Sequence, residues 1–206
     1  MGADVKRKSG CRSTILVLAL LLAVTLGMNW VATRIDMWRF PWGYAESGKP
    51  TLTGTWVGPL TSGSGQRLAM LVDIQLAPLD YHRRRSSIIR TRRNTWLIGR
   101  VFVCGGSASV KHFTAYGTPD DEATASRFHL GLSPSDSVPP DGLAPSNVRG
   151  RWDGRDALAV ETSLYLRRGK SAISSSADPD TRGATPLTMK RGTEAEFNSL
   201  CGRLRG

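Results

Sequence analysis

Residues 68–76 read LAMLVDIQL, and their apolar residues recur at every second position. Leu68, Met70 and Val72 would share one face of a strand, whereas Asp73 would fall on the other. Alternation with period two is typical of a strand that has one buried face. The pattern recurs through the rest of the chain and predicts about eight strands, at 53–57, 68–76, 95–104, 108–116, 126–132, 147–153, 156–166 and 185–191.

Loops rich in Pro, Gly, Ser and Asp separate these strands, for example residues 133–147 and 174–184. One helix is predicted after the last strand, over 193–204. It begins with Thr193 and Glu196 at capping-box spacing, and an apolar face at i, i+3, i+4 and i+7 follows. Many short antiparallel strands with a single late helix predict an all-β fold, either a barrel or a sandwich.

The N-terminal part contains an uncharged stretch, residues 14–32, which is close to the length that spans a bilayer as a helix. Basic residues precede it, so the positive-inside rule places the N-terminus in the cytoplasm. A cleaved signal peptide is the alternative, although a matching cleavage site is poor. We expect a basic cytoplasmic tail over 1–13, a transmembrane anchor over 14–32, a membrane-proximal linker over 33–50 and an exported domain over 51–206. The predicted location is the inner (cytoplasmic) membrane, with the domain in the periplasm or another extracytoplasmic space.

The charge balance is strongly basic, with 28 Lys and Arg against 17 Asp and Glu in 206 residues, a net charge of +11. Such a chain attracts anionic partners, which include lipid headgroups and envelope polymers. Export argues against nucleic acid. The most strongly basic stretch lies in residues 81–96. It either binds an anionic lipid or envelope polymer, or it forms a solvated loop whose charge discourages aggregation. Its arginines are Arg83, Arg84, Arg85, Arg90, Arg92 and Arg93.

Two glycine–x–tryptophan–x–glycine steps occur near predicted strand ends, GTWVG at 54–58 and GRWDG at 150–154. Each tryptophan falls on the apolar face of its strand. A glycine two residues earlier leaves room on that face for the indole or for a crossing strand. The Asp-Gly pair after Trp152 predicts a hairpin turn. The simplest interpretation is a large core side chain beside each turn.

The first of these steps carries a family resemblance. Gly54-Thr55-Trp56, at the start of an eight-strand pattern, resembles the GxW motif that opens the lipocalins and related calycin barrels. In that family the tryptophan closes one end of the barrel, and an arginine from near the end of the last strand covers it. Arg191 takes that place here. The resemblance implies a barrel with a C-terminal helix that binds a small apolar or amphipathic ligand, although the family's threonine–aspartate–tyrosine motif is not recognisable.

Candidate ligand-lining or barrel-closing residues are aromatic and arginine side chains on apolar strand faces. Trp96, Arg100 and Phe102 share one face of a predicted strand, and an arginine on such a face needs a counter-charge or a polar ligand group. The full candidate set is Trp56, Trp96, Arg100, Phe102, Trp152 and Arg191.

Cys104 and Cys201 both lie in the exported part, where disulfides form. A bond between them would pin the late helix to the sheet, and two buried free thiols are the alternative. Zinc, phosphate-loop and nucleophile-elbow motifs are not recognised, so we expect no enzymatic activity, cofactor or metal centre. The predicted function is a membrane-anchored binding protein with a lipocalin-like barrel. The alternative is a cell-envelope interaction or assembly protein that uses its basic loop to meet an anionic partner.

Overall fold

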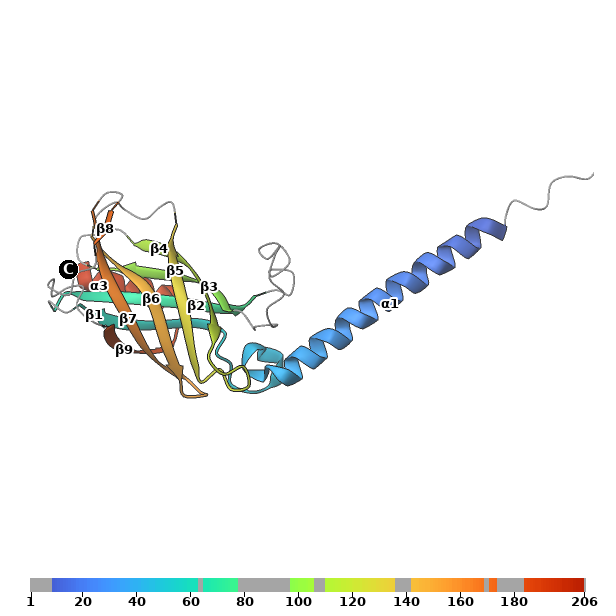
Figure 1. The fold of residues 1–206 in the computed structure, drawn as a ribbon, viewed down its shortest axis with the longest axis horizontal. Coiled ribbons are helices and arrows are strands. Elements are labelled where there is room, and N and C mark those ends of the chain that lie inside the picture. Colours follow the sequence, from blue (N-terminus) through green and yellow to red (C-terminus); the bar gives the residue numbers. More distant parts are fainter. Residues whose placement is uncertain are drawn as a thin grey trace, which may run out of the picture.

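The computed structural model describes the chain over residues 9–62, 65–77, 97–105, 110–135, 142–168, 171–173 and 184–205. A long helix, α1 (Ser9–Arg39), projects from one end of a β-barrel (Figure 1). Its segment Thr14–Arg39 is long and apolar enough to cross a membrane, and none of its most apolar stretch is buried against the barrel. The helix therefore runs beyond the predicted 14–32 and includes much of the expected linker.

In the part of the chain that the structure describes, nine antiparallel strands follow α1, and eight of them close the barrel (Figure 1). Consecutive strands pair from β1 to β7, β9 pairs with β7, and β9 also pairs with β1 through Trp56↔Arg191 and Val57↔Lys190. The short β8 extends one end of β7 outside this cycle. The bounds are β1 Gly54–Thr61, β2 Arg67–Leu76, β3 Leu97–Cys104, β4 Lys111–Pro119, β5 Arg127–Pro134, β6 Gly142–Trp152, β7 Ala157–Arg168, β8 Ser171–Ile173 and β9 Ala184–Arg191.

The main core lies inside the barrel, because the alternating apolar residues point inward. Met70, Val72 and Ile74 of the opening stretch are fully buried there, as predicted from their spacing. Phe128 of β5 and Met189 of β9 belong to the same core cluster and are 1% and 0% exposed. Burial of alternate apolar side chains from every strand is what fixes the strand register.

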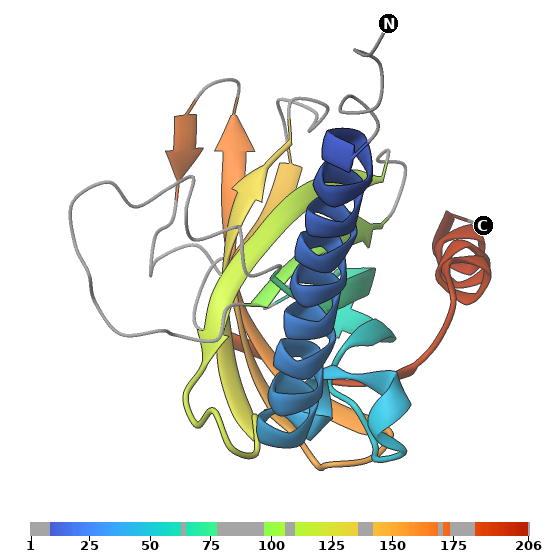
Figure 2. The same cartoon turned by 90° about the vertical axis from the view of Figure 1, so that its right-hand side faces the viewer.

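A second layer covers part of the outer wall. Helix α3 (Glu194–Arg205) packs against β2 and β1 and stands outside the strands (Figure 2). The predicted capping box begins it: the Thr193 backbone N–H donates to Glu196 Oε2 at 2.7 Å. The buried face of α3, Phe197 and Cys201, meets Val57 and other outward apolar residues of β1–β3 in a smaller cluster.

The segment between α1 and the barrel is folded onto one barrel end. It contains two single 3-10 turns, η1 (Pro41–Gly43) and η2 (Ala45–Ser47). Trp42 in η1 is 3% exposed and belongs to the main core. Its indole N–H donates to the Glu122 carbonyl at 2.9 Å, in the loop between β4 and β5. We call this the proximal end of the barrel and the opposite end the distal end.

Candidate functional site

The proximal end is closed by a stack of Arg191 on Trp56. The two residues are paired across β9 and β1, and the guanidinium carbon lies 4.1 Å from the indole ring centroid. Trp56 is fully buried and donates its indole N–H to the Leu52 carbonyl at 2.9 Å. Arg191 Nη1 donates to the Thr53 carbonyl at 2.6 Å. The arginine that the sequence matched to the tryptophan therefore covers it.

Burial changes the electrostatics of this stack. Desolvation lowers the pKa of the Arg191 guanidinium, and the nearby charge of Asp156 partly opposes that change. The cation is held by a carbonyl and an aromatic face rather than by a carboxylate in direct contact. A partly desolvated cation over a tryptophan gains more from the ring than an exposed one does. The geometry thus serves to seal the barrel end.

The two glycine–x–tryptophan steps have different structural reasons. Gly54 has φ near +120°, and a Cβ there would overlap the Arg191 guanidinium. Gly150 pairs with Phe128, and a Cβ on Gly150 would overlap the Phe128 ring inside the barrel. Trp152 then lies at the predicted hairpin, where its indole N–H donates to the Arg155 carbonyl at 3.0 Å. The repeat is therefore two separate packing solutions.

The barrel interior is filled by side chains over the described strands. The buried core cluster that occupies it has members no more than 8% exposed, including Phe113, Leu130 and Leu164. A cavity large enough for a ligand would leave accessible surface on the side chains around it. These residues show no such surface.

Arg100 and Phe102 lie on the outer wall, which corrects the expectation that they line the interior. Strand β3 turns Val101 and Val103 inward and Arg100 and Phe102 outward. The Arg100 side chain is 69% exposed and makes a salt bridge of 3.3 Å with Asp73 on β2. Its predicted counter-charge is present, but as a surface ion pair. Phe102 packs under α3, so its apolar character serves the outer layer.

The remaining predicted residues fall in the connection from β2 to β3. Trp96 and the arginines of the basic run lie outside the described residues, between Ala77 and Leu97. The strand ends that hold this connection are at the proximal end: a Cβ on Gly43 of η1 would overlap the Leu76 side chain. The described residues on either side of this connection, Leu76 and Leu97, therefore lie at the end where α1 joins the barrel.

Cys104 and Cys201 lie at disulfide-bonding distance, with their Cα atoms 5.9 Å apart. The pair connects the end of β3 to the buried face of α3, as the sequence predicted. Phe197 contacts Phe102 one turn away, with ring centroids 6.4 Å apart. The bond and the aromatic contact together hold the helix on the outer wall.

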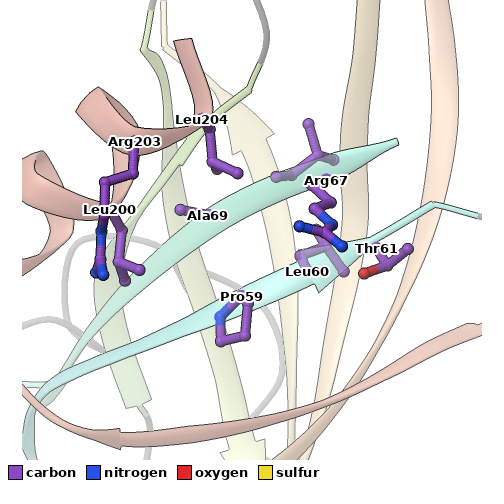
Figure 3. Close-up of a pocket in the computed structure, with 9 residues that line it drawn as sticks. Pro59, Leu60, Thr61, Arg67, Ala69, Leu200, Arg203 and Leu204 are labelled. Atoms are coloured by element: carbon purple, nitrogen blue, oxygen red, sulfur yellow. The ribbon is translucent and has the colours of Figure 1, made fainter. Parts of the chain in front are cut away.

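An apolar groove lies beside this helix, at the distal end of β1 and β2. It measures about 370 Å³ and includes Pro59, Leu200 and Leu204 in its lining, with Arg67 and Arg203 at its sides (Figure 3). A second hollow of about 530 Å³ lies on the outer wall formed by β5, β6, β7 and β9. Both hollows face outward rather than into the barrel.

Two residues near the barrel ends were missed by sequence reasoning. Trp42 falls within the stretch that we expected to be a linker, although Pro41 and Gly43 on either side are a turn signal that separates it from the helix. Lys111 is 5% exposed and shares the inward face of β4 with Phe113, at the distal end. The sequence does contain a signal for this position. Lys111 lies two residues before Phe113, and in a strand this spacing places both side chains on the same face.

Metal-binding chemistry has no candidate among the residues that the structure describes, where no three His, Cys, Asp or Glu side chains gather. His129 instead lies 3.2 Å from Asp120 on the surface. Comparison with known proteins finds no match to this chain among protein-family models, curated proteins or solved structures.

Proposed function

We propose that this protein is a membrane-anchored, non-enzymatic interaction or assembly protein of the cell envelope, with a lipocalin-like barrel that acts as a packed scaffold. The observation that carries this proposal is the filled interior. Phe128, Met70 and Met189 fill the barrel where a lipocalin would hold its ligand, and all are at most 1% exposed. The hollows described above open on the outer wall, where they are accessible to a partner.

The placement of the barrel supports the same role. Helix α1 has the length and apolarity of a membrane span, and the proximal segment from Pro41 onward is folded against the barrel. Trp42 and Leu52 bury their side chains in the core and link their backbones through a 2.8 Å hydrogen bond. A barrel held in this way stays close to the membrane in which α1 is anchored. The basic run is attached at the same end and would meet anionic lipid or polymer there.

Site-specific photo-crosslinking in cells tests this proposal. A benzophenone amino acid is placed at Thr61 or Thr188, which line the two outer hollows, and at Glu194 as an exposed control outside both. We expect discrete protein adducts of reproducible mass from at least one hollow and none from the control. Failure of both hollow positions to give a protein adduct above the level of the control would reject the interaction role.

Binding of an amphipathic ligand is the second candidate function. Lys111 favours it, because a buried cation on the inner face at the distal end would suit the carboxylate of such a ligand. A stoichiometric fatty acid that co-purifies with the full chain, and that is lost on Lys111→Met, would establish this alternative. Retention of the fatty acid by the variant would exclude this lysine as its contact.

A further inference from the structure

The hollow on β5, β6, β7 and β9 contains two arginines that face one another. Arg127 on β5 and Arg151 on β6 are direct cross-strand partners, and both side chains are exposed on the outer wall. Side chains directly opposite in an antiparallel pair have Cβ atoms about 4.5–5.5 Å apart, and like charges in this position repel. The fold therefore holds two cations together at a cost in stability.

Among the described residues, neither arginine has a salt bridge; Asp120, whose backbone N–H donates to the Arg127 carbonyl at 2.8 Å, lies 3.2 Å from His129 instead. Across the outer wall the row continues from Arg151 to Ala159 on β7 and then to Thr188 on β9, all uncharged positions. Over the part of the chain that the structure describes, salt bridges join Arg100 to Asp73 and His129 to Asp120, and neither involves this pair. Small side chains beside two uncompensated guanidinium groups leave a basic hollow of about 530 Å³.

One carboxylate does lie in the hollow, and it is already engaged. Asp153 Oδ1 accepts hydrogen bonds from the backbone N–H groups of Arg155 and Ala157, at 2.8 and 3.2 Å. These bonds hold it in the β6–β7 hairpin. Glu161, the next acidic residue along β7, is the cross-strand partner of Arg149, one row further toward the distal end. The two arginines are thus left for an external anion.

The donors in this hollow match a phosphate group. Each guanidinium presents a planar pair of N–H donors that can bind two oxygens of one oxyanion. Ser126 and Thr188 add hydroxyl groups to the lining. Ala157 and Ala159 supply small apolar side chains beside these donors, which suits a phosphate attached to an organic group better than a bare ion.

The position of the hollow favours a lipid as the source of that phosphate. Arg127 begins β5 directly after the loop whose Glu122 carbonyl accepts the Trp42 indole hydrogen bond. Five residues of extended chain cover at most about 17 Å, so the hollow begins near the point where the α1 segment meets the barrel. We propose that Arg127 and Arg151 form a phosphate-binding site for the headgroup of an anionic phospholipid. Only the lipid source rests on the membrane anchoring proposed above.

Thermal unfolding of the full chain in lipid nanodiscs tests this site. Nanodiscs of phosphatidylcholine are compared with nanodiscs that also contain phosphatidylglycerol, and inorganic phosphate is added to the first kind in a separate arm. The variant R127Q/R151Q removes the pair, and R67Q/R203Q removes the same charge from the other hollow. We expect phosphatidylglycerol to raise Tm for the wild type and for R67Q/R203Q but not for R127Q/R151Q.

Tm in phosphatidylcholine alone shows whether R127Q/R151Q folds as the wild type does. In phosphatidylcholine alone, R127Q/R151Q should unfold at a temperature equal to or above that of the wild type, because repulsion is relieved. If inorganic phosphate raises Tm, and only R127Q/R151Q abolishes this rise, the ligand of the site is free phosphate rather than a lipid headgroup. If both double variants lose the Tm rise equally, or if the wild type shows no Tm rise, the proposed site is contradicted. Photo-crosslinking from Thr61, which lines the other hollow, does not depend on this outcome, so the two proposals fail separately.

Discussion

Replacement of Arg191 by methionine is the sharpest test of how the barrel is closed. The change keeps an unbranched apolar stem but removes the guanidinium that lies 4.1 Å from the Trp56 ring centroid and that donates to the Thr53 carbonyl at 2.6 Å. A hydrogen bond from a charged donor contributes about 1.5–3 kcal/mol. A partly desolvated cation–π contact adds about 1–2 kcal/mol. Since such terms are not additive, we expect a net loss of about 2–4 kcal/mol in the free energy of unfolding.

Guanidinium unfolding of the full chain in detergent micelles, followed by far-UV circular dichroism, measures this loss. Arg203→Met on the exposed face of α3 is the matched control and should change stability by no more than about 0.5 kcal/mol. A double-mutant cycle with Trp56→Leu isolates the stack, for which we expect a coupling of about 1–2 kcal/mol. An R191M variant as stable as the control, with no coupling to Trp56, would refute the closing role.

Three other perturbations follow from the packing. Gly150→Val should cost about 1–3 kcal/mol in thermal unfolding, because its side chain would overlap the phenylalanine ring that the glycine contacts. Replacing Cys104 and Cys201 by serine removes a link across 97 residues, which the chain-entropy treatment values at about 4–5 kcal/mol. Reducing agent should lower the stability of the wild type to that of the variant and leave the variant unchanged. The hydrogen bond from the Thr124 hydroxyl lowers the pKa of the Asp121 carboxyl in the folded state. The ionised carboxylate therefore stabilises the fold at pH values above the pKa that Asp121 has in the unfolded chain. This stabilisation is lost as the pH falls through the lower pKa of the folded state. Asp121→Asn should remove this acid-sensitive part, measured by hydrogen exchange of the loop, and an unchanged pH profile would contradict the assignment.

Much of the fold follows from residue spacing alone. Alternation in 68–76 predicts a strand whose inward residues are Met70, Val72 and Ile74, and these belong to the core inside the barrel. The capping box before α3 is a local signal of the same kind, because its residues have few other uses at that spacing. The partnership of Trp56 with Arg191 was instead implied by the resemblance to the lipocalins, since the two residues are far apart in the chain.

The wrong assignments arose where both faces of a strand are apolar. Strand β3 carries Val101 and Val103 on one face and Phe102 and Cys104 on the other, and spacing alone does not say which face enters the barrel. The answer depends on α3, which covers the outer face nearly a hundred residues later in the chain through Cys201. Trp42 was misplaced for a similar reason, because its partner, the Glu122 carbonyl, is 80 residues away.

Native mass spectrometry of the full chain, released from mild detergent, tests most directly whether the barrel is a packed scaffold. Because the interior is filled, we expect the mass of the bare polypeptide. Any additional peaks should come from bound lipid molecules, and R127Q/R151Q should reduce the number of these peaks. Substitution of Phe128, which is 1% exposed at the centre of the core, by alanine would open space inside and is the matched comparison. A stoichiometric apolar ligand on the wild type, retained when Arg127 and Arg151 are replaced, would contradict the account.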